Sequence, residues 1–361
     1  MYLKSGNKKE CSGCTACLNI CPKNAIKMVY DEEGFEYPVI DKEKCIECGA
    51  CYKICPNVKK EENNTIIEAH GAKHKNENER ITSRSGGVFI ALSDYILKQN
   101  GVIYGVEFTQ DFDAIHSRAT DKEQRDKFKG SKYIQSHMGN IIQEVKKDLQ
   151  NGKKVMFSGT PCQVAAVNAC IPKIYQENLY TVDLICHGVP SKAIFNDFLK
   201  YIKEQNNKEI KNFIFRDKRF GWESHYETFI FEDDTELTTQ YFRNLFYGHH
   251  ILRPSCYNCN YANIHRPADI TIADFWGIDK VNPKFMDQKG VSLAIINNEK
   301  GKKLFNIIKD NLNTIECSLE DCIKYTYTLN QPTPVTENRH EFWKDYKNEK
   351  FEYIIKKYAT E

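Results

Sequence analysis

The chain has 361 residues, including 15 cysteines, and its 51 lysines and arginines nearly balance its 49 aspartates and glutamates, for a formal charge of +2. We expect no membrane span, because no run of about 18 apolar residues occurs, and no general nucleic-acid binding, because the chain has no large basic excess. The N-terminal residues lack the apolar stretch of a secretion signal, so we expect a cytoplasmic protein whose reduced thiols bind metal.

Two runs of four cysteines, each followed by a proline, lie at the start of the chain. Both read C-x2-C-x2-C-x3-C-P, the spacing of bacterial ferredoxins that hold two [4Fe–4S] clusters. In such ferredoxins the fourth cysteine of each run binds the other cluster. The predicted first set is therefore Cys11, Cys14, Cys17 and Cys55, and the predicted second set is Cys45, Cys48, Cys51 and Cys21. Two structural zinc sites are the alternative, although zinc usually takes two C-x2-C pairs per site.

A β-hairpin is predicted between the two cysteine runs. Its strands cover residues 26–30 and 35–40, and its turn covers residues 31–34. The hairpin and the cysteines together indicate a small α+β, ferredoxin-like two-cluster module over residues 1–60. Residues 57–65 are rich in Lys, Glu and Asn, as is typical of a linker. We therefore assign residues 61–361 to a second, larger domain.

Strand and helix patterns alternate along this larger domain. In chain order we predict a strand over 66–70, a helix over 88–98, strands over 101–106 and 116–120, a helix over 140–149, a strand over 154–157, a helix after 162, a strand over 180–186 and a helix over 193–204. Such alternation indicates an α/β domain with a central mixed sheet. Residues 210–237 are instead expected to form an aromatic-rich antiparallel excursion.

Three turns of the larger domain are candidates for binding phosphate or a flavin ring. The Rossmann and P-loop glycine motifs are both missing, which disfavours a standard dinucleotide site. Residues 85–87 precede a predicted helix, whose free N–H groups favour anions. Residues 129–133 carry two lysines and a tyrosine, and residues 158–161 follow a predicted strand, where α/β domains place ligands. Each turn taken alone could also be an ordinary cap.

Four later cysteines form a looser group. Cys162 and Cys186 each follow a predicted strand, so both should lie at the same edge of the sheet, and Cys256 and Cys259 form a C-x2-C pair. Together they could hold a third [4Fe–4S] cluster, or they could be buried free cysteines. The remaining cysteines show no such arrangement and are expected to be structural: Cys170, Cys317 and Cys322.

Several short motifs occur in a fixed order along the larger domain: Ser85-Gly86-Gly87, Gly130-Ser131-Lys132-Tyr133, Ser158-Gly159-Thr160-Pro161-Cys162-Gln163, Cys186-His187-Gly188-Val189-Pro190-Ser191, and the segment 268–277, ADITIADFWG. As an ordered set they resemble the coenzyme F420 hydrogenase/dehydrogenase beta-subunit family, and the resemblance covers nearly the whole chain, with the ferredoxin module as an N-terminal fusion. The resemblance implies a non-Rossmann FAD site, a [4Fe–4S] cluster at the four later cysteines, and a reducible deazaflavin as substrate.

On this resemblance, the flavin-binding residues are expected in the ordered motifs. They are Ser85, Gly86, Gly87, Gly130, Ser131, Lys132, Tyr133, Ser158, Gly159, Thr160, Gln163, His187 and Gly188. His187 follows the cluster ligand Cys186 and is the candidate catalytic residue, as a proton donor near the flavin. A structural role for this histidine is the alternative.

The expected protein is an oxidoreductase that passes electrons between a hydride-carrying small molecule, such as an F420-like deazaflavin, and a one-electron redox protein or partner subunit. A flavin belongs at the junction, because it exchanges both hydride and single electrons. Two alternatives are a ferredoxin-fed reductase of another organic substrate, such as a sugar or a tetrapyrrole, and a non-catalytic electron-carrier subunit.

Overall fold

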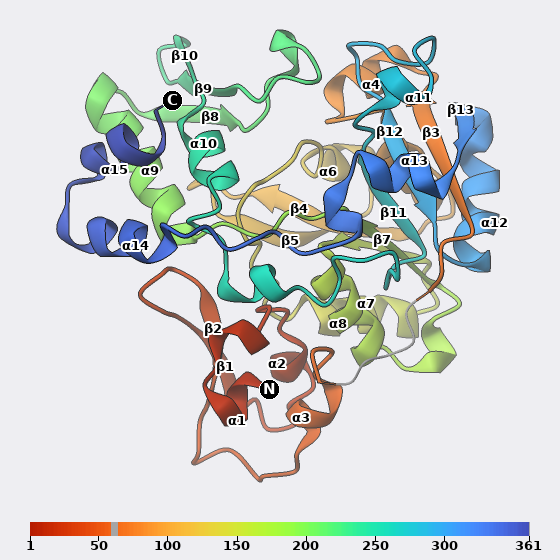
Figure 1. Ribbon diagram of the computed structural model, residues 1–361. Coiled ribbons are helices and arrows are strands. Elements are labelled where there is room, and N and C mark those ends of the chain that lie inside the picture. Colours follow the sequence, from red (N-terminus) through yellow and green to blue (C-terminus); the bar gives the residue numbers. More distant parts are fainter. Residues whose placement is uncertain (59–63, 361) are drawn as a thin grey trace.

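The structure, a computed structural model, describes residues 1–58 and 64–360 and shows a small module against a larger domain (Figure 1). The small module contains the hairpin of β1 (Ile26–Tyr30) and β2 (Glu36–Ile40), and three short helices, α1 (Tyr2–Ser5), α2 (Ala16–Asn19) and α3 (Ala50–Ile54). The hairpin lies where the sequence predicts it. The predicted domain boundary at residue 60 and part of the predicted linker lie outside the described residues.

An eight-stranded sheet forms the centre of the larger domain, in the order β13-β3-β12-β11-β7-β6-β4-β5. The central strands β11, β7, β6 and β4 run parallel to one another, and the outer strands pair antiparallel. The predicted central mixed sheet is therefore confirmed. Its strands are β3 (Glu68–His74), β4 (Val102–Phe108), β5 (Ala114–Ala119), β6 (Val155–Gly159), β7 (Leu179–Leu184), β11 (Ile270–Asp274), β12 (Ser292–Ile296) and β13 (Leu312–Cys317).

Helices cover both faces of this sheet, because its central strands are apolar on both sides. In β6, Val155 and Phe157 contribute to the core under α7 (Ile141–Gln150) and α8 (Pro161–Cys170). Met156, which points to the opposite face, contributes to the core under α5 (Val88–Lys98) and α12 (Glu299–Ile308). One strand thus serves two cores through the alternation of its side chains.

The predicted strands of the main sheet all differ from the observed ones by a few residues at their ends, and two of these differences have a clear reason. β3 continues to His74, beyond the predicted 66–70, because its second half pairs with the edge strand β13, which the sequence analysis did not predict. β7 ends at Leu184, short of the predicted end at Cys186. The chain turns there, and the N–H of Gly188 donates to the sulfur of Cys186 at 3.4 Å. Cys186 therefore lies on a turn beyond the strand.

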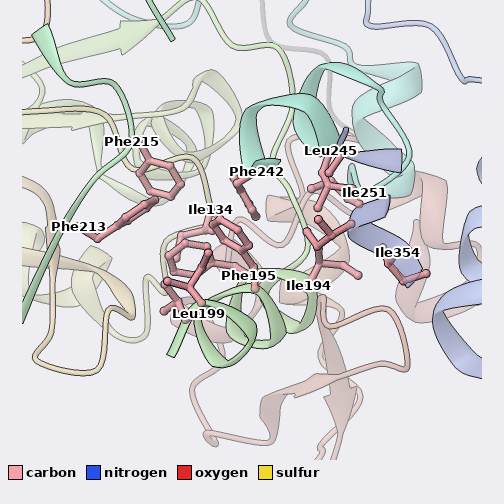
Figure 2. Packing of buried hydrophobic residues seen from close by; sticks show 14 of the residues in the cluster. Ile134, Ile194, Phe195, Leu199, Phe213, Phe215, Phe242, Leu245, Ile251 and Ile354 are labelled. Atoms are coloured by element: carbon pink, nitrogen blue, oxygen red, sulfur yellow. The ribbon is translucent and has the colours of Figure 1, made fainter. Parts of the chain in front are cut away.

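The predicted antiparallel excursion is a separate sheet of β8 (Ile210–Ile214), β9 (Glu227–Phe231) and β10 (Glu236–Thr239). It packs with α9 (Lys192–Asn206), α10 (Tyr241–Tyr247), α14 (Arg339–Asn348) and α15 (Phe351–Tyr358) around an aromatic core (Figure 2). Phe213 and Phe215 meet edge to face at 4.6 Å, and Phe195 stands edge-on to Phe242 at 5.3 Å. The aromatic residues of this segment thus build a second core beside the main sheet.

The remaining helices named here are short: α4 (Glu77–Thr82), α6 (Lys122–Asp126), α11 (Ile278–Val281) and α13 (Leu319–Lys324). Among all described residues, none of the helices has the length and apolar character needed to cross a membrane.

The small module is docked tightly on the larger domain, where α2 packs against α7 and α8. A Cβ atom on Gly34, at the tip of the hairpin, would lie 2.6 Å from the backbone nitrogen of Ala193. The hydroxyl of Ser191 donates to the carbonyl of Glu33, and Arg339 forms an ion pair with the Glu33 carboxylate. Backbone contact, hydrogen bond and ion pair together hold the hairpin against α9 and α14.

The carboxyl of Glu227 caps α10 from inside the protein and generates a prediction about pH. It is 1% exposed and accepts hydrogen bonds from the backbone N–H groups of Phe242 and Arg243 and from the hydroxyl of Thr239. Burial raises the pKa of Glu227 to about 7, although the hydrogen bonds from Thr239 and the backbone oppose this shift. The folded state therefore holds this proton more tightly than the unfolded chain does.

The stabilisation linked to this proton is fully present below about pH 4 and is lost as the pH rises through 7. We expect the free energy of unfolding to fall by about 2–3 kcal/mol between pH 5 and pH 8 from this group. Glu227→Gln, which carries no titrating proton, should remove that part of the slope in urea titrations at the two pH values. Glu209→Gln, at a side chain that is 72% exposed, is the control and should keep the slope. An unchanged slope in Glu227→Gln would contradict the assignment.

Candidate functional site

The structure brings the predicted first cysteine set together around a small cavity of about 30 Å³. Cys11, Cys14, Cys17 and Cys55 all line it, so the last cysteine of the second run lies with the first three of the first run. Burial raises the pKa of Cys17, and the nearby thiols of Cys11 and Cys55 raise it further. Thiols crowded in this way need a positive group to hold them as thiolates.

The second set lies beside the first, toward the surface of the module. Burial raises the pKa of Cys51, and Cys21 and Cys45 add to this shift. Cys48, on the same loop, is exposed. Cys51 also contributes to the raised pKa of Cys17, which shows that the two sets adjoin.

The third set surrounds a cavity of about 420 Å³ between the small module and the larger domain, which we call the proximal cavity. Its four thiols belong to Cys162, Cys186, Cys256 and Cys259. Burial raises the pKa of Cys256, and Cys186, Cys259 and Cys162 all add to the shift. β6 and β7 are parallel neighbours, so the residues that follow them, Cys162 and Cys186, lie at one edge of the sheet. Cys256 lies in a 3₁₀ turn over residues 254–258, and Cys259 directly follows that turn.

Backbone N–H groups point at several of these sulfurs. Ala25 donates to Cys21 at 3.3 Å, and Val189 and Tyr261 donate to Cys256 and Cys259 at 3.4 Å. Hydrogen bonds of this kind tune the potentials of iron–sulfur clusters. Within residues 1–58 and 64–360, no three His, Cys, Asp or Glu side chains converge as one metal ion requires. The thiols border spaces instead, which suits a multi-atom cluster better than zinc, with its Zn–S distance of about 2.3 Å.

A further cavity of about 300 Å³, here named the ligand cavity, lies at the carboxyl ends of β6 and β7. This is the edge where α/β domains bind ligands. All the predicted flavin-binding residues except Gly86 line it, so the structure brings the three candidate turns together. Gly86 lies just behind the wall, where its N–H donates to the hydroxyl of Ser292 at 2.8 Å.

The loop before α5 leaves the N-terminus of that helix open toward the ligand cavity. Gly87, its N-cap residue, has φ +91° and no side chain with which to cap the helix. The ammonium of Lys218 fixes the loop by donating hydrogen bonds to the carbonyl oxygens of Arg80, Ser83 and Ser85, at 2.8, 2.9 and 3.1 Å. A helix N-terminus prepared in this way suits a phosphate or another anion.

The two lysines predicted in the 129–133 turn are already engaged. Lys129 pairs with Glu79 at 2.8 Å, and the ammonium of Lys132 donates to the backbone oxygens of Lys127, Lys129 and Gly130. Burial lowers the pKa of Lys132 to about 8. These lysines therefore shape the turn, and their ammonium groups are not free to point into the ligand cavity.

A hydrogen-bonded chain runs along the floor of the ligand cavity to a cysteine of the third set. His116 accepts a hydrogen bond from the Ser136 hydroxyl at 3.0 Å, and the amide of Gln163 donates to Ser136 at 2.9 Å. The carbonyl of Gln163 accepts from Thr160, whose hydroxyl lies 3.2 Å from the sulfur of Cys162. Gln163 thus closes the capping box of α8 and holds the hydroxyl that contacts the cysteine.

Several residues that line the ligand cavity were not predicted. Arg216 pairs with Asp274 at 2.6 Å, Trp276 stacks on Trp222 at 5.3 Å, and Tyr247 lies across the cavity. Asp274 and Trp276 belong to the ordered motif at 268–277, so the sequence did carry a signal for them. Arg216 and Tyr247 had no such signal, because they come from the antiparallel excursion and the helix beyond it.

Two guanidinium groups at the ligand cavity have spare donors. The Nε atoms of Arg84 and Arg216 are buried and have no hydrogen-bond partner within the part of the chain that the structure describes. Buried N–H groups without partners are rare in folded proteins, because each loses its hydrogen bonds to water. Their position therefore suits a ligand that brings hydrogen-bond acceptors into the cavity.

His187 lies on the wall that the ligand cavity shares with the proximal cavity. Burial lowers its pKa to about 4, and His249 and Arg216 lower it further, so the ring is neutral at pH 7. Its Nδ1 lies 3.3 Å from the hydroxyl of Tyr327. The shared wall consists of Thr160, Cys186, His187, Gly188 and Val189.

Two family models match the chain. Residues 10–58 match the 4Fe-4S dicluster domain, and residues 152–320 match the model that describes the C terminus of the coenzyme F420 hydrogenase/dehydrogenase beta subunit. Over residues 152–320 the chain is therefore similar to the coenzyme F420 hydrogenase/dehydrogenase beta-subunit family. The resemblance seen in the ordered motifs is confirmed, and the protein is an iron–sulfur oxidoreductase related to this beta subunit.

A fold similar to that of the present chain also occurs in a solved structure. A chain of the xenon-derivatized F420-reducing [NiFe] hydrogenase complex from Methanosarcina barkeri superimposes with a TM-score of 0.50 at 17% sequence identity. The match covers 73% of the present chain and 85% of that chain. A search among curated proteins gave no match.

Proposed function

We propose that the protein uses FAD and three [4Fe–4S] clusters to pass electrons between a hydride-carrying small molecule, such as an F420-like deazaflavin, and a one-electron partner. The observation that carries this proposal is the shared wall. Thr160 and residues 186–189 border both the ligand cavity and the cavity of the third cysteine set. A redox-active organic group in one cavity and a cluster in the other would be separated by a single layer of residues.

The residues of the ligand cavity fit a flavin dinucleotide in their chemistry. The open N-terminus of α5 suits a phosphate, and the spare Nε donors of Arg84 and Arg216 suit the acceptor atoms of a flavin ring. Tyr247 and Trp276 offer aromatic surface on the same cavity. When bound, the flavin supplies the exchange between hydride and single electrons, and the clusters supply one-electron transfer.

The protein's own residues hold the site in shape. Arg216 is fixed by Asp274, which also accepts a hydrogen bond from the ring of Trp222 at 2.7 Å. Lys218 fixes the loop before α5, and Gln163 fixes the hydroxyl beside Cys162. Neutral His187 has a free position for a proton and a hydrogen-bonded tyrosine, Tyr327, that is 38% exposed. We propose that this pair moves the proton that accompanies hydride oxidation.

The order of the cysteine sets suggests the route of the electrons. Tyr261 is 6% exposed, and its pKa is raised by burial and by cysteines of two sets, Cys14 and Cys55 from the first and Cys162 and Cys259 from the third. The third set therefore adjoins the first set, which in turn adjoins the second set. At the far end, Cys48 is exposed and its neighbour Ile46 is 58% exposed. We propose that the one-electron partner docks at this end.

The first test is an iron count. Three four-thiolate sets imply about twelve iron atoms per chain after anaerobic reconstitution. Cys256→Ala should remove about four of them, because a cluster that lacks one thiolate is labile, and should leave the ferredoxin pair intact. Cys170→Ala is the matched control, because Cys170, like Cys256, is a partly buried thiol of the larger domain but lines neither cysteine cavity. A full iron count in Cys256→Ala would show that the cysteines of the third set bind no cluster and are only buried free thiols.

The second test concerns the hydride donor. Reduced coenzyme F420 should bleach the bound flavin under anaerobic conditions and then reduce the ferredoxin clusters, as followed by absorption and electron paramagnetic resonance. In Cys256→Ala the flavin should still bleach, while reduction of the ferredoxin clusters should slow by at least tenfold. If neither reduced F420 nor a nicotinamide bleaches the flavin but reduced clusters do, the protein is a ferredoxin-fed reductase of another substrate. A chain that takes up no flavin would be an electron carrier.

The third test addresses the loop that supports the flavin. A Cβ atom on Gly86 would meet the carbonyl oxygen of Ala72 and lie 2.5 Å from the backbone nitrogen of Ser292. Gly86→Ala must therefore shift the backbone before α5, and we expect flavin content to fall to a small fraction of the wild-type value while the iron count stays unchanged. Gly152→Ala is the control for a strained glycine substitution elsewhere: its φ of +74° disfavours alanine, but no atom lies within 4 Å of the added Cβ and Gly152 does not line the ligand cavity, so flavin content should be unchanged. Full flavin content in Gly86→Ala would place the flavin elsewhere.

A further inference from the structure

Arg253 is a buried cation at the boundary between the small module and the larger domain. Its side chain is 0% exposed. The Nε atom donates to the carbonyl of Cys11 at 2.7 Å, and Nη2 donates to the carbonyl of Glu36 at 2.8 Å. Nη1 donates to the side-chain oxygen of Gln135 in the larger domain at 2.8 Å. One guanidinium thus connects the cysteine loop, the hairpin and the larger domain.

The same guanidinium contacts a predicted cluster ligand directly. Its Nη2 lies 3.7 Å from the sulfur of Cys11, in hydrogen-bonding geometry. Its plane lies over the ring of Tyr37 at 4.3 Å and near that of Phe35 at 5.6 Å. A Cβ atom on Gly13, the second residue after Cys11, would lie 2.9 Å from Nη1. The cysteine loop therefore packs closely against the Arg253 side chain.

The charge of Arg253 has no carboxylate partner within residues 1–58 and 64–360. A fully buried cation without a counter-ion is costly, because it has lost its hydration. Cysteines of two sets interact with this cation. Nη2 contacts the sulfur of Cys11 in the first set, and in the third set burial raises the pKa of Cys162 while Arg253 lowers it. Thiolates that hold a negatively charged cluster would supply the missing counter-charge.

The backbone of Arg253 ties the same residue to the third set. Its N–H donates to the carbonyl of Val189, on the shared wall, at 3.0 Å. Its own carbonyl accepts the N–H of Cys256 at 2.9 Å. Movement of the ferredoxin loop would therefore be transmitted to the turn that carries the C-x2-C pair.

We propose that Arg253 is a positioning residue that locks the ferredoxin module onto the larger domain and raises the reduction potential of the first ferredoxin cluster. A fixed positive charge beside the cluster stabilises its reduced form, which carries one more negative charge than the oxidised form. The inference rests on the assignment of Cys11 to a cluster, and not on the flavin or the hydride donor.

The test is a redox titration of the full chain, reconstituted with iron and sulfide and reduced with dithionite, followed by electron paramagnetic resonance. In Arg253→Met, the oxidised-to-reduced ratio of one ferredoxin cluster should rise at least tenfold at its wild-type midpoint potential, which corresponds to a midpoint about 59 mV lower for one electron. Arg253→Lys keeps the charge but loses the planar guanidinium with its several N–H donors. Its oxidised-to-reduced ratio should therefore lie between those of wild type and Arg253→Met. The cluster held by Cys21, Cys45, Cys48 and Cys51 should keep its midpoint and serves as the internal reference.

Arg339→Met is the matched control. Arg339 also crosses the boundary, pairing with Glu33, and it lies over the rings of Tyr257 and Trp343, but it contacts no cysteine among the described residues. Its removal should leave all midpoints unchanged. Equal shifts in Arg253→Met and Arg339→Met, or no shift in Arg253→Met with a full iron count, would overturn the proposal. If Arg253→Met does not retain iron, the lysine variant decides: a lowered midpoint supports the proposal, and an unchanged one overturns it.

Discussion

The parallel pairing of β6 with β7 is the constraint on which the rest of the site depends. Because their carboxyl ends open at the same edge of the sheet, the turns that follow them, 160–163 and 186–189, lie side by side. Each turn carries one cysteine that lines the proximal cavity, and Thr160, Gln163 and residues 187–189 of the two turns line the ligand cavity. A pairing in another order would separate Cys162 from Cys186 and would leave neither cavity with a complete wall.

The sequence was most informative where chemistry and spacing coincide. The two cysteine runs predict the 4Fe–4S dicluster domain, because the ligands of a cubane must recur at short fixed intervals, and β1 and β2 follow from alternation and a turn. The helix over 88–98 was predicted with its correct bounds, because Gly86-Gly87 precedes a clear apolar periodicity. The mixed sheet followed from alternating elements, but three of its strands, β11, β12 and β13, were not predicted. The pairing of β13 with β3 spans more than 230 residues of sequence.

The candidate site was also predictable only in part, because some of its residues meet only through contacts between segments that are distant in the sequence. Ordered motifs located the three turns of the ligand cavity, and strand ends located Cys162 and Cys186. Arg216, Tyr247 and Arg253 reach their sites from segments without a recognisable motif, and their roles depend on tertiary docking. Arg253 lies three residues before Cys256, yet nothing in that spacing indicates that its side chain turns away from the C-x2-C pair and enters the ferredoxin module.

Two buried guanidinium groups flank the proposed electron route, and their surroundings differ. Arg266, near the third set, donates to the carbonyls of Tyr261 and Leu184 and pairs with the buried carboxyl of Asp183 at 3.2 Å. Its charge is therefore offset within the larger domain. Arg253, between the third and first sets, has no such carboxylate among the described residues, and its side chain reaches the first set. Under the proposed function, the charge of Arg253 favours an added negative charge at the first ferredoxin cluster, and so favours transfer of electrons from the ligand cavity toward the exposed end of the module.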